Sequence, residues 1–222
     1  MMKKVIASFT FILISVVMLA QADYSLFTRD IRSYSDNYSD DQVMVLYENH
    51  YGVPRNTLVQ LFGGFGYDWG NVALGLEISN FLGLPVGDLL IDYRDHRGDG
   101  WGVMAKRYGI KPGSAEFHRM KEVMSNKNRY WRDVYNDYGQ NRDPAVARRN
   151  RLVFNDQLII LDGISTKEMK HINKEIEKRN KKIYKREKKM MKEWEKENKK
   201  IRRQTEKMRK EQGKQMKKNG KW

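Results

Sequence analysis

The chain has 222 residues, contains no cysteine and carries a formal net charge of +15. The lack of cysteine excludes disulfides, thiol nucleophiles, cysteine-ligated zinc and a lipid-modified cysteine behind a leader. The charge is unevenly placed: residues 166–222 hold 24 Lys and Arg against 9 Asp and Glu, whereas residues 1–165 hold 19 of each sign. The basicity therefore belongs to the C-terminal segment and not to the rest of the chain.

Residues 1–22 have the pattern of a cleaved signal peptide. Two lysines precede an apolar stretch, and the small residues Ala20 and Ala22 flank one position before the expected cut. The apolar stretch is shorter than the about 20 residues that a membrane-spanning helix needs, which makes an uncleaved anchor the weaker alternative. We expect an exported protein, periplasmic or secreted, that starts at Asp23 and is not a lipoprotein.

The mature chain should begin with a polar arm, residues 23–39, followed by a domain of helical hairpins, residues 40–139. Asp40 or Asp41 is expected to cap the first helix of this domain, which Gly52 ends. Further along, Asp68 can cap a helix that ends at Gly83. Glycine just past a helix and proline just inside its start are the punctuation that backbone geometry favours.

Two Trp-Gly pairs mark expected helix starts, 32 residues apart. We expect both tryptophans to hold one hairpin against the next, because a single hairpin cannot bury its apolar face alone. A long helix should follow the second pair, with one apolar stripe facing the hairpins. The residues predicted to have structural roles are Trp69, Trp101, Gly83, Gly109 and Pro112.

A connecting helix is expected over residues 140–163, and a long basic helix over residues 165–212. Ser165 and Glu168 form a capping-box pattern, and residues 166–212 contain neither glycine nor proline. Apolar residues follow a seven-residue step with about one per heptad, fewer than the two that a stable coiled coil needs. The pattern predicts a solvated helix with weak self-association and a disordered end, residues 213–222. The predicted fold class is all-α.

The positive charge suggests that this helix binds an anionic surface or polymer: envelope lipid, lipopolysaccharide, wall polymer or nucleic acid. The residues predicted to bind are Lys181, Lys182, Lys185, Arg186, Lys188, Lys189, Lys192, Lys199, Lys200, Arg202 and Arg203. A soluble spacer is the plain alternative. The four histidines are scattered without ligand spacing, so we expect no metal, no cofactor and no catalytic residue.

Two other functions remain as alternatives. The first is a cell-envelope enzyme with a site in the acidic, glycine-containing region 92–100, where Asp92, Asp95, His96 and Asp99 lie. The second is a helix-turn-helix reader of nucleic acid in residues 101–121. That segment has a small positive balance, whereas affinity for DNA comes mainly from phosphate neutralisation, so we do not expect sequence-specific DNA binding.

The region from Gly52 to Lys121 resembles a group of exported bacterial proteins with no assigned biochemical activity. The shared motifs are Gly-Val-Pro at residues 52–54, a tryptophan before a helix at Trp69, GLPVGD at residues 83–88, and GDGWGVMAKRYGIKPGSAEFHRMK at residues 98–121. The resemblance covers about a third of the chain and implies an exported helical domain. It brings no catalytic residues, and the basic helix lies outside the shared pattern.

Overall fold

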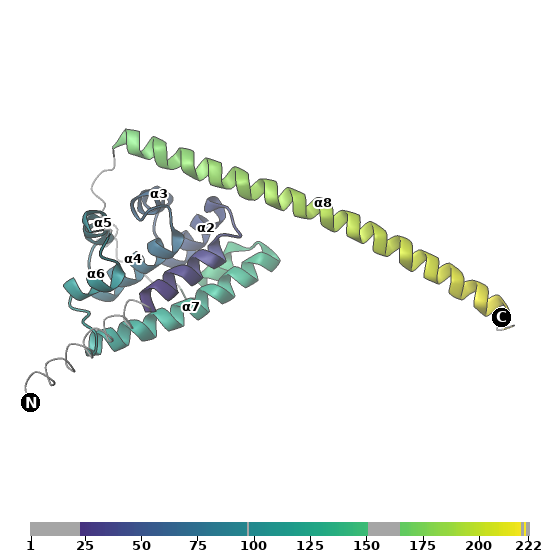
Figure 1. Cartoon of the computed structure of the whole chain (residues 1–222), viewed down its shortest axis with the longest axis horizontal. Helices are drawn as coiled ribbons and strands as arrows, with labels where there is room; N and C mark the ends of the chain where they lie inside the picture. Colours follow the sequence, from purple (N-terminus) through teal and green to yellow (C-terminus); the bar gives the residue numbers. More distant parts are fainter. Residues whose placement is uncertain (1–22, 97, 151–164, 219, 221–222) are drawn as a thin grey trace, which may run out of the picture. The chain divides into compact units, whose positions relative to one another are not determined.

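The computed structural model describes residues 23–96, 98–150, 165–218 and 220. Every regular element in this part of the chain is helical, which confirms the all-α prediction (Figure 1). Residues 23–35 are helical, and the elements after them are α2 (Asp40–Tyr51), α3 (Arg55–Gly64), α4 (Trp69–Leu82), α5 (Val86–Asp95), α6 (Trp101–Arg107), α7 (Ala115–Asn141), the 3-10 helix η1 (Pro144–Asn150) and α8 (Thr166–Lys218). The expected signal peptide, with Ala20 and Ala22, and residues 151–163 of the expected connecting helix lie outside the described residues.

The described residues up to Glu177 form one compact unit, called here the helical domain. Helix α4 forms its centre, since the residues of α4 from Trp69 to Ser79 are almost all buried. A helix that is apolar on all sides is stable when other helices surround it. Its boundaries match the predicted punctuation. Asp68 accepts hydrogen bonds from the backbone N–H groups of Gly70 and Asn71, at 2.8 and 3.2 Å, and Gly83 adopts the left-handed conformation at φ 64°.

The predicted cap of α2 was wrong by one residue. Ser39, and neither Asp40 nor Asp41, caps the helix: its hydroxyl accepts from the backbone N–H of Gln42, whose side chain accepts in return from the Ser39 N–H. Asp40 is buried instead and accepts a hydrogen bond from Trp69 Nε1 at 2.8 Å. The carboxylate therefore serves a contact between helices that local sequence does not reveal.

The polar arm predicted over residues 23–39 was also wrong, because residues 23–35 form a helix that is part of the core. Tyr24, Phe27 and Ile31 are each at most 2% exposed, at a spacing that places them on one helical face. The helix runs parallel to α7 (Figure 1). Its backbone also approaches the start of α4 so closely that a Cβ on Gly70 would lie 2.0 Å from the carbonyl oxygen of Thr28.

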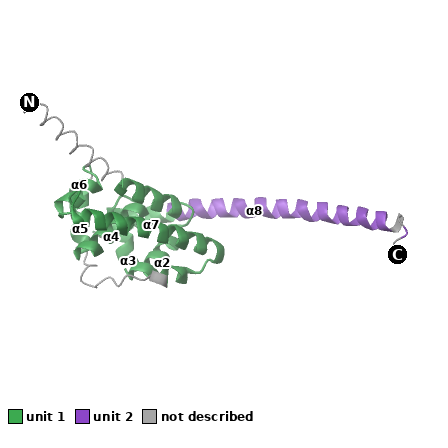
Figure 2. Ribbon diagram, turned by 90° about the horizontal axis from the view of Figure 1, so that it is seen from below, with its two compact units in different colours: residues 1–177 green, residues 178–222 purple. Residues whose placement is uncertain are grey.

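Helix α8 begins as predicted, with Ser165 accepting a hydrogen bond from the backbone N–H of Glu168 at 3.2 Å. The disordered end predicted from residue 213 was wrong in part, because the helix continues through Gly213 to Lys218. The chain divides into two compact units inside this helix, at Glu177 and Lys178 (Figure 2). None of the described helices is both long and apolar enough to cross a bilayer.

The first turns of α8 belong to the helical domain. Ile172 and Ile176 are buried, and a Cβ on Gly63 of α3 would lie 2.3 Å from Ile172 Cδ1. The glycine therefore leaves the space that the isoleucine fills. The domain boundary predicted at residue 165 was too early, since at least three turns of α8 complete the core.

Candidate functional site

The part of α8 that lies in the second unit, residues 178–218, carries the excess positive charge. Residues 178–218 contain 20 Lys and Arg against 6 Asp and Glu. At about 100° per residue, the half of the helix centred on Ile183 contains three of these cations and four carboxylates. The opposite half, called here the basic half, contains 17 cations and two carboxylates. The charge is therefore concentrated along one side.

The structure places the eleven predicted binding residues on the exposed surface of this helix. Ten lie on the basic half, and Arg186 lies on the other. Ion pairs along the helix join Lys189 to Glu193, Lys200 to Glu197 and Lys210 to Glu206. Two carboxylates cannot neutralise 17 cations, so the basic half keeps a strong positive potential along its length.

A buried polar cluster joins three helices of the helical domain and was not predicted. It consists of His50 and Tyr51 on α2, Glu77 on α4 and Lys127 on α7. The ammonium of Lys127 lies 3.2 Å from Glu77 Oε1 and 2.8 Å from His50 Nε2. The hydroxyl of Tyr51 donates to Glu77 Oε1 at 2.8 Å. Because an ammonium can only donate, His50 Nε2 accepts and the ring is neutral.

Burial dominates the electrostatics of this cluster. It lowers the pKa of His50 to about 3, and the positive charge of Lys127 acts in the same direction. Burial also raises the pKa of Glu77 and lowers that of Lys127, while the attraction between these two groups opposes both shifts. Burying one charge alone would be costly, so the two ions and their hydrogen bonds must be present together.

The cluster has the residue types of an acid–base site but little access to solvent. His50 is 0% exposed and Glu77 is 1% exposed, while the Lys127 side chain is 16% exposed. The Lys127 ammonium also lies over the rings of Tyr51 and Tyr130. These contacts make the cluster an anchor between α2, α4 and α7, because a substrate could not reach its polar atoms without opening the domain.

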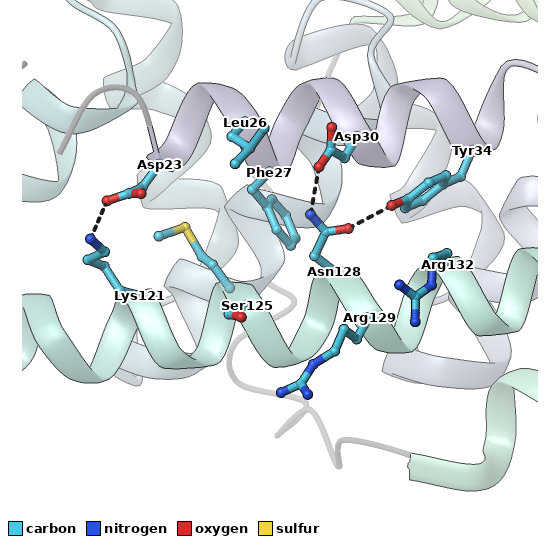
Figure 3. A pocket seen from close by; sticks show the side chains of 11 residues that line it. Asp23, Leu26, Phe27, Asp30, Tyr34, Lys121, Ser125, Asn128, Arg129 and Arg132 are labelled. Atoms are coloured by element: carbon cyan, nitrogen blue, oxygen red, sulfur yellow. Dashed lines mark hydrogen bonds and ion pairs between the residues drawn. The ribbon is translucent and has the colours of Figure 1, made fainter. Parts of the chain in front are cut away.

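A groove of about 480 Å³ lies between the helical residues 23–35 and α7 (Figure 3). Polar contacts between residues 23–35 and α7 span this groove, as Figure 3 shows. Lys121 pairs with Asp23 at 2.8 Å, and Asn128 both donates to Asp30 and accepts from Tyr34, at 2.9 Å each. The walls bear charges of both signs, so the groove favours no single class of charged ligand.

In the two alternative sites, within residues 92–121, several charged side chains form ion pairs with each other. Arg107 contacts both Asp92 and Asp99, and His96 lies 2.8 Å from Asp92, so the acidic region links α5 to α6. At the start of α7, Arg119 pairs with Glu116 at 3.2 Å. Asp92, His96 and Asp99 of the enzyme alternative, and Arg119 of the DNA-reader alternative, are thus engaged within the domain.

The two Trp-Gly positions occupy equivalent places at the start of α4 and α6. Trp69 stacks on Phe62 of α3, with ring centroids 4.4 Å apart. Trp101 donates from Nε1 to Asn71 Oδ1 at 2.9 Å, which joins α6 to α4. Gly109 adopts a positive φ of 86° in the turn that follows α6, and Pro112 lies before the Ser114 cap of α7.

No protein-family model, curated protein or solved structure matches the chain.

Proposed function

We propose that this is an exported, non-enzymatic helical protein whose basic half of α8 binds an anionic surface or polymer of the cell envelope. The N-terminal pattern supports export, and the motifs of residues 52–121 support membership of the exported bacterial group that they resemble. The helical domain acts as the folded body, and residues 178–218 supply the binding surface. Among these ligands, we propose a membrane rich in anionic lipid head groups.

The observation that carries the proposal is the sidedness of the charge. A helix lying on a flat surface presents one side to it, and one side of residues 178–218 holds 17 of the 20 cations in that segment. Each Lys or Arg close to an anionic bilayer contributes about 1 kcal/mol. A uniformly charged helix would leave half of its cations facing away, so the segregation favours a surface over a role as a neutral spacer.

The enzyme alternative has less support, because ion pairs to Arg107 hold the carboxylates of Asp92 and Asp99. The nucleic-acid alternative shares the electrostatic chemistry of the basic half and differs in the polymer that supplies the phosphates.

The test is binding of the whole chain from Asp23 to vesicles of phosphatidylglycerol and phosphatidylcholine, compared with pure phosphatidylcholine. We expect binding to the anionic vesicles alone and its release in 0.5 M salt, because the screening length falls well below the about 8 Å of physiological salt. Replacing Lys181, Lys185, Lys188 and Lys192 by glutamine should weaken binding by about a hundredfold or more.

The matched control removes the same charge from the exposed surface of the helical domain, through glutamine at Arg29, Lys106, Lys111 and Lys170. This variant should bind like the unaltered chain. Equal loss in both variants would mean that net charge and not the basic half determines binding. Equal binding to neutral vesicles would contradict the proposal altogether.

A further inference from the structure

The half of α8 opposite the basic half carries a narrow row of large apolar side chains, called here the apolar stripe: Ile183, Met190, Trp194, Ile201 and Met208. At about 100° per residue they fall within about 40° of one another. Met190, Trp194 and Ile201 are 60%, 64% and 50% exposed. Large apolar side chains gathered in one exposed row mark an interaction surface more often than isolated ones do.

The stripe cannot face the same flat surface as the basic half, because the two lie on opposite sides of the helix. It is also not a simple lipid anchor, since the cations of such a helix flank its apolar face. The same helical face packs on the helical domain earlier in α8, where Ile172 and Ile176 are buried. The stripe therefore continues a row that already serves as a helix-packing surface.

The spacing of the stripe is the same in both chain directions about Lys192. Met190 and Trp194 lie two residues on either side of that position, and Ile183 and Ile201 lie nine residues on either side. A second copy turned end to end would place Ile183 opposite Ile201 and Met190 opposite Trp194. Met208 would fall opposite Ile176, which the helical domain covers, so the contact is limited to residues 183–201 and the last turns of α8 diverge from the partner there. This is the self-complementarity that a two-fold symmetric contact requires.

Charge also permits pairing of two copies on this side. The half of the helix around the stripe contains three cations, Arg179, Arg186 and Arg209, and four carboxylates. Two such halves meet with nearly balanced charge, whereas the 17 cations of each basic half point away from the contact. A strongly charged partner would gain little here, and an identical stripe would fit.

We propose that the apolar stripe is the contact between two copies of this chain, which pair through antiparallel α8 helices centred at Lys192. The register places Glu187 of one copy beside Glu197 of the other. Arg186, which lies on the half around the stripe, brings a cation of each copy to the flank of this pair. The two polar layers limit the affinity and specify the register. The inference does not depend on binding to an anionic surface.

Because the chain contains no cysteine, introduced thiols test this pairing directly. Two single variants of the whole chain from Asp23, Ile183→Cys and Ile201→Cys, are purified and then mixed under a mild oxidant. We expect a cross-linked dimer containing one chain of each variant, because the register brings these positions opposite each other. Each variant alone should cross-link poorly, since its two thiols would be about 27 Å apart.

The matched control uses Lys181→Cys and Arg203→Cys, which are also symmetric about Lys192 but lie on the basic half. Their mixture should give no cross-link. Sedimentation equilibrium of the unaltered chain should show a mass that rises from one chain toward two with concentration, and glutamine at Met190, Trp194 and Ile201 should abolish that rise. A parallel pair would cross-link each stripe variant with itself, and a stripe used for lipid or another protein would leave the chain monomeric; either result overturns the proposal.

Discussion

At the scale of single residues, the cluster of His50, Glu77 and Lys127 stands out because it buries charge inside an apolar domain. The arrangement is stable when Glu77 and Lys127 are both ionised and His50 is neutral, since each group then has a partner of suitable polarity. Protonation of His50 would place a second cation beside Lys127. The histidine therefore links the stability of the fold to pH.

The pKa of His50 predicts the direction of that link. Between pH 6.5 and about 3 the unfolded chain binds a proton at this residue and the folded chain does not, so stability falls as the pH falls. From pH 6.5 to 4.5 the loss should be about 2–3 kcal/mol. Burial raises the pKa of Glu77, so in the pH range just above the usual pKa of a glutamate the folded chain binds a proton at this residue more readily than the unfolded chain does. This residue therefore makes the fold more stable as the pH falls, and its effect opposes that of His50.

The measurement is the free energy of urea unfolding at pH 6.5 and 4.5. His50→Gln keeps an acceptor for Lys127 but removes the titration, so its stability should depend less on pH than that of the unaltered chain. His118→Gln, at an exposed position, should keep the full dependence. Equal pH dependence in all three proteins would refute the role given to His50.

Trp69 and Trp101 lead to a prediction about packing. Both are buried, and replacing either by alanine should cost about 3–5 kcal/mol, a large part of the stability of a domain of this size. Tyr184→Ala is the control, because that side chain is 72% exposed and lies outside the apolar stripe. Thermal unfolding should show a large drop in Tm for the two buried positions and almost none for Tyr184. Small shifts at both buried positions would contradict their role in joining the hairpins.

At the scale of helices, sequence was informative where backbone geometry restricts the residue type. Gly52 and Gly83 end their helices in the left-handed conformation, which glycine adopts at little cost, so these boundaries were predictable. The helix over residues 23–35 was missed because polar residues dominate it. Its signal was present in Tyr24, Phe27 and Ile31, whose spacing of three and four matches one face of a helix.

The buried polar cluster could not be predicted in the same way. His50, Glu77 and Lys127 are separated by up to 77 residues, and their proximity follows from how α2, α4 and α7 pack. One local signal existed: Glu77 is the single charged residue in the apolar sequence of α4. A lone carboxylate on the buried side of a helix requires a partner, but sequence does not identify which residue that is.

The helix over residues 23–35 also bears on processing. We predict that N-terminal sequencing of the mature protein will begin at Asp23. A cut even two residues further on would remove Tyr24, which is 1% exposed. Material that starts at Met1 would favour an uncleaved anchor, and a start beyond Phe27 would contradict the place of this helix in the core.

At the scale of the whole molecule, the end of the helical domain does not coincide with the start of the basic helix, as the sequence had suggested. The basic helix begins at Thr166, but the helical domain keeps its residues up to Glu177. A chain ending at Gly163 would lose Ile172 and Ile176 from the core as well as the cations. A chain ending at Glu177 separates the two contributions, because it keeps both isoleucines and removes residues 178–222.

The burial of Tyr24 and Phe27 so near the expected cut also sets an order of events in time. A peptidase needs the bond before Asp23 in an extended strand, whereas Asp23 is already helical in the finished fold. On the proposed export route, cleavage must therefore precede the docking of residues 23–35 onto α7. A precursor that folded early would hide its own processing site, so the speed of folding relative to translocation would decide how much mature protein a cell obtains.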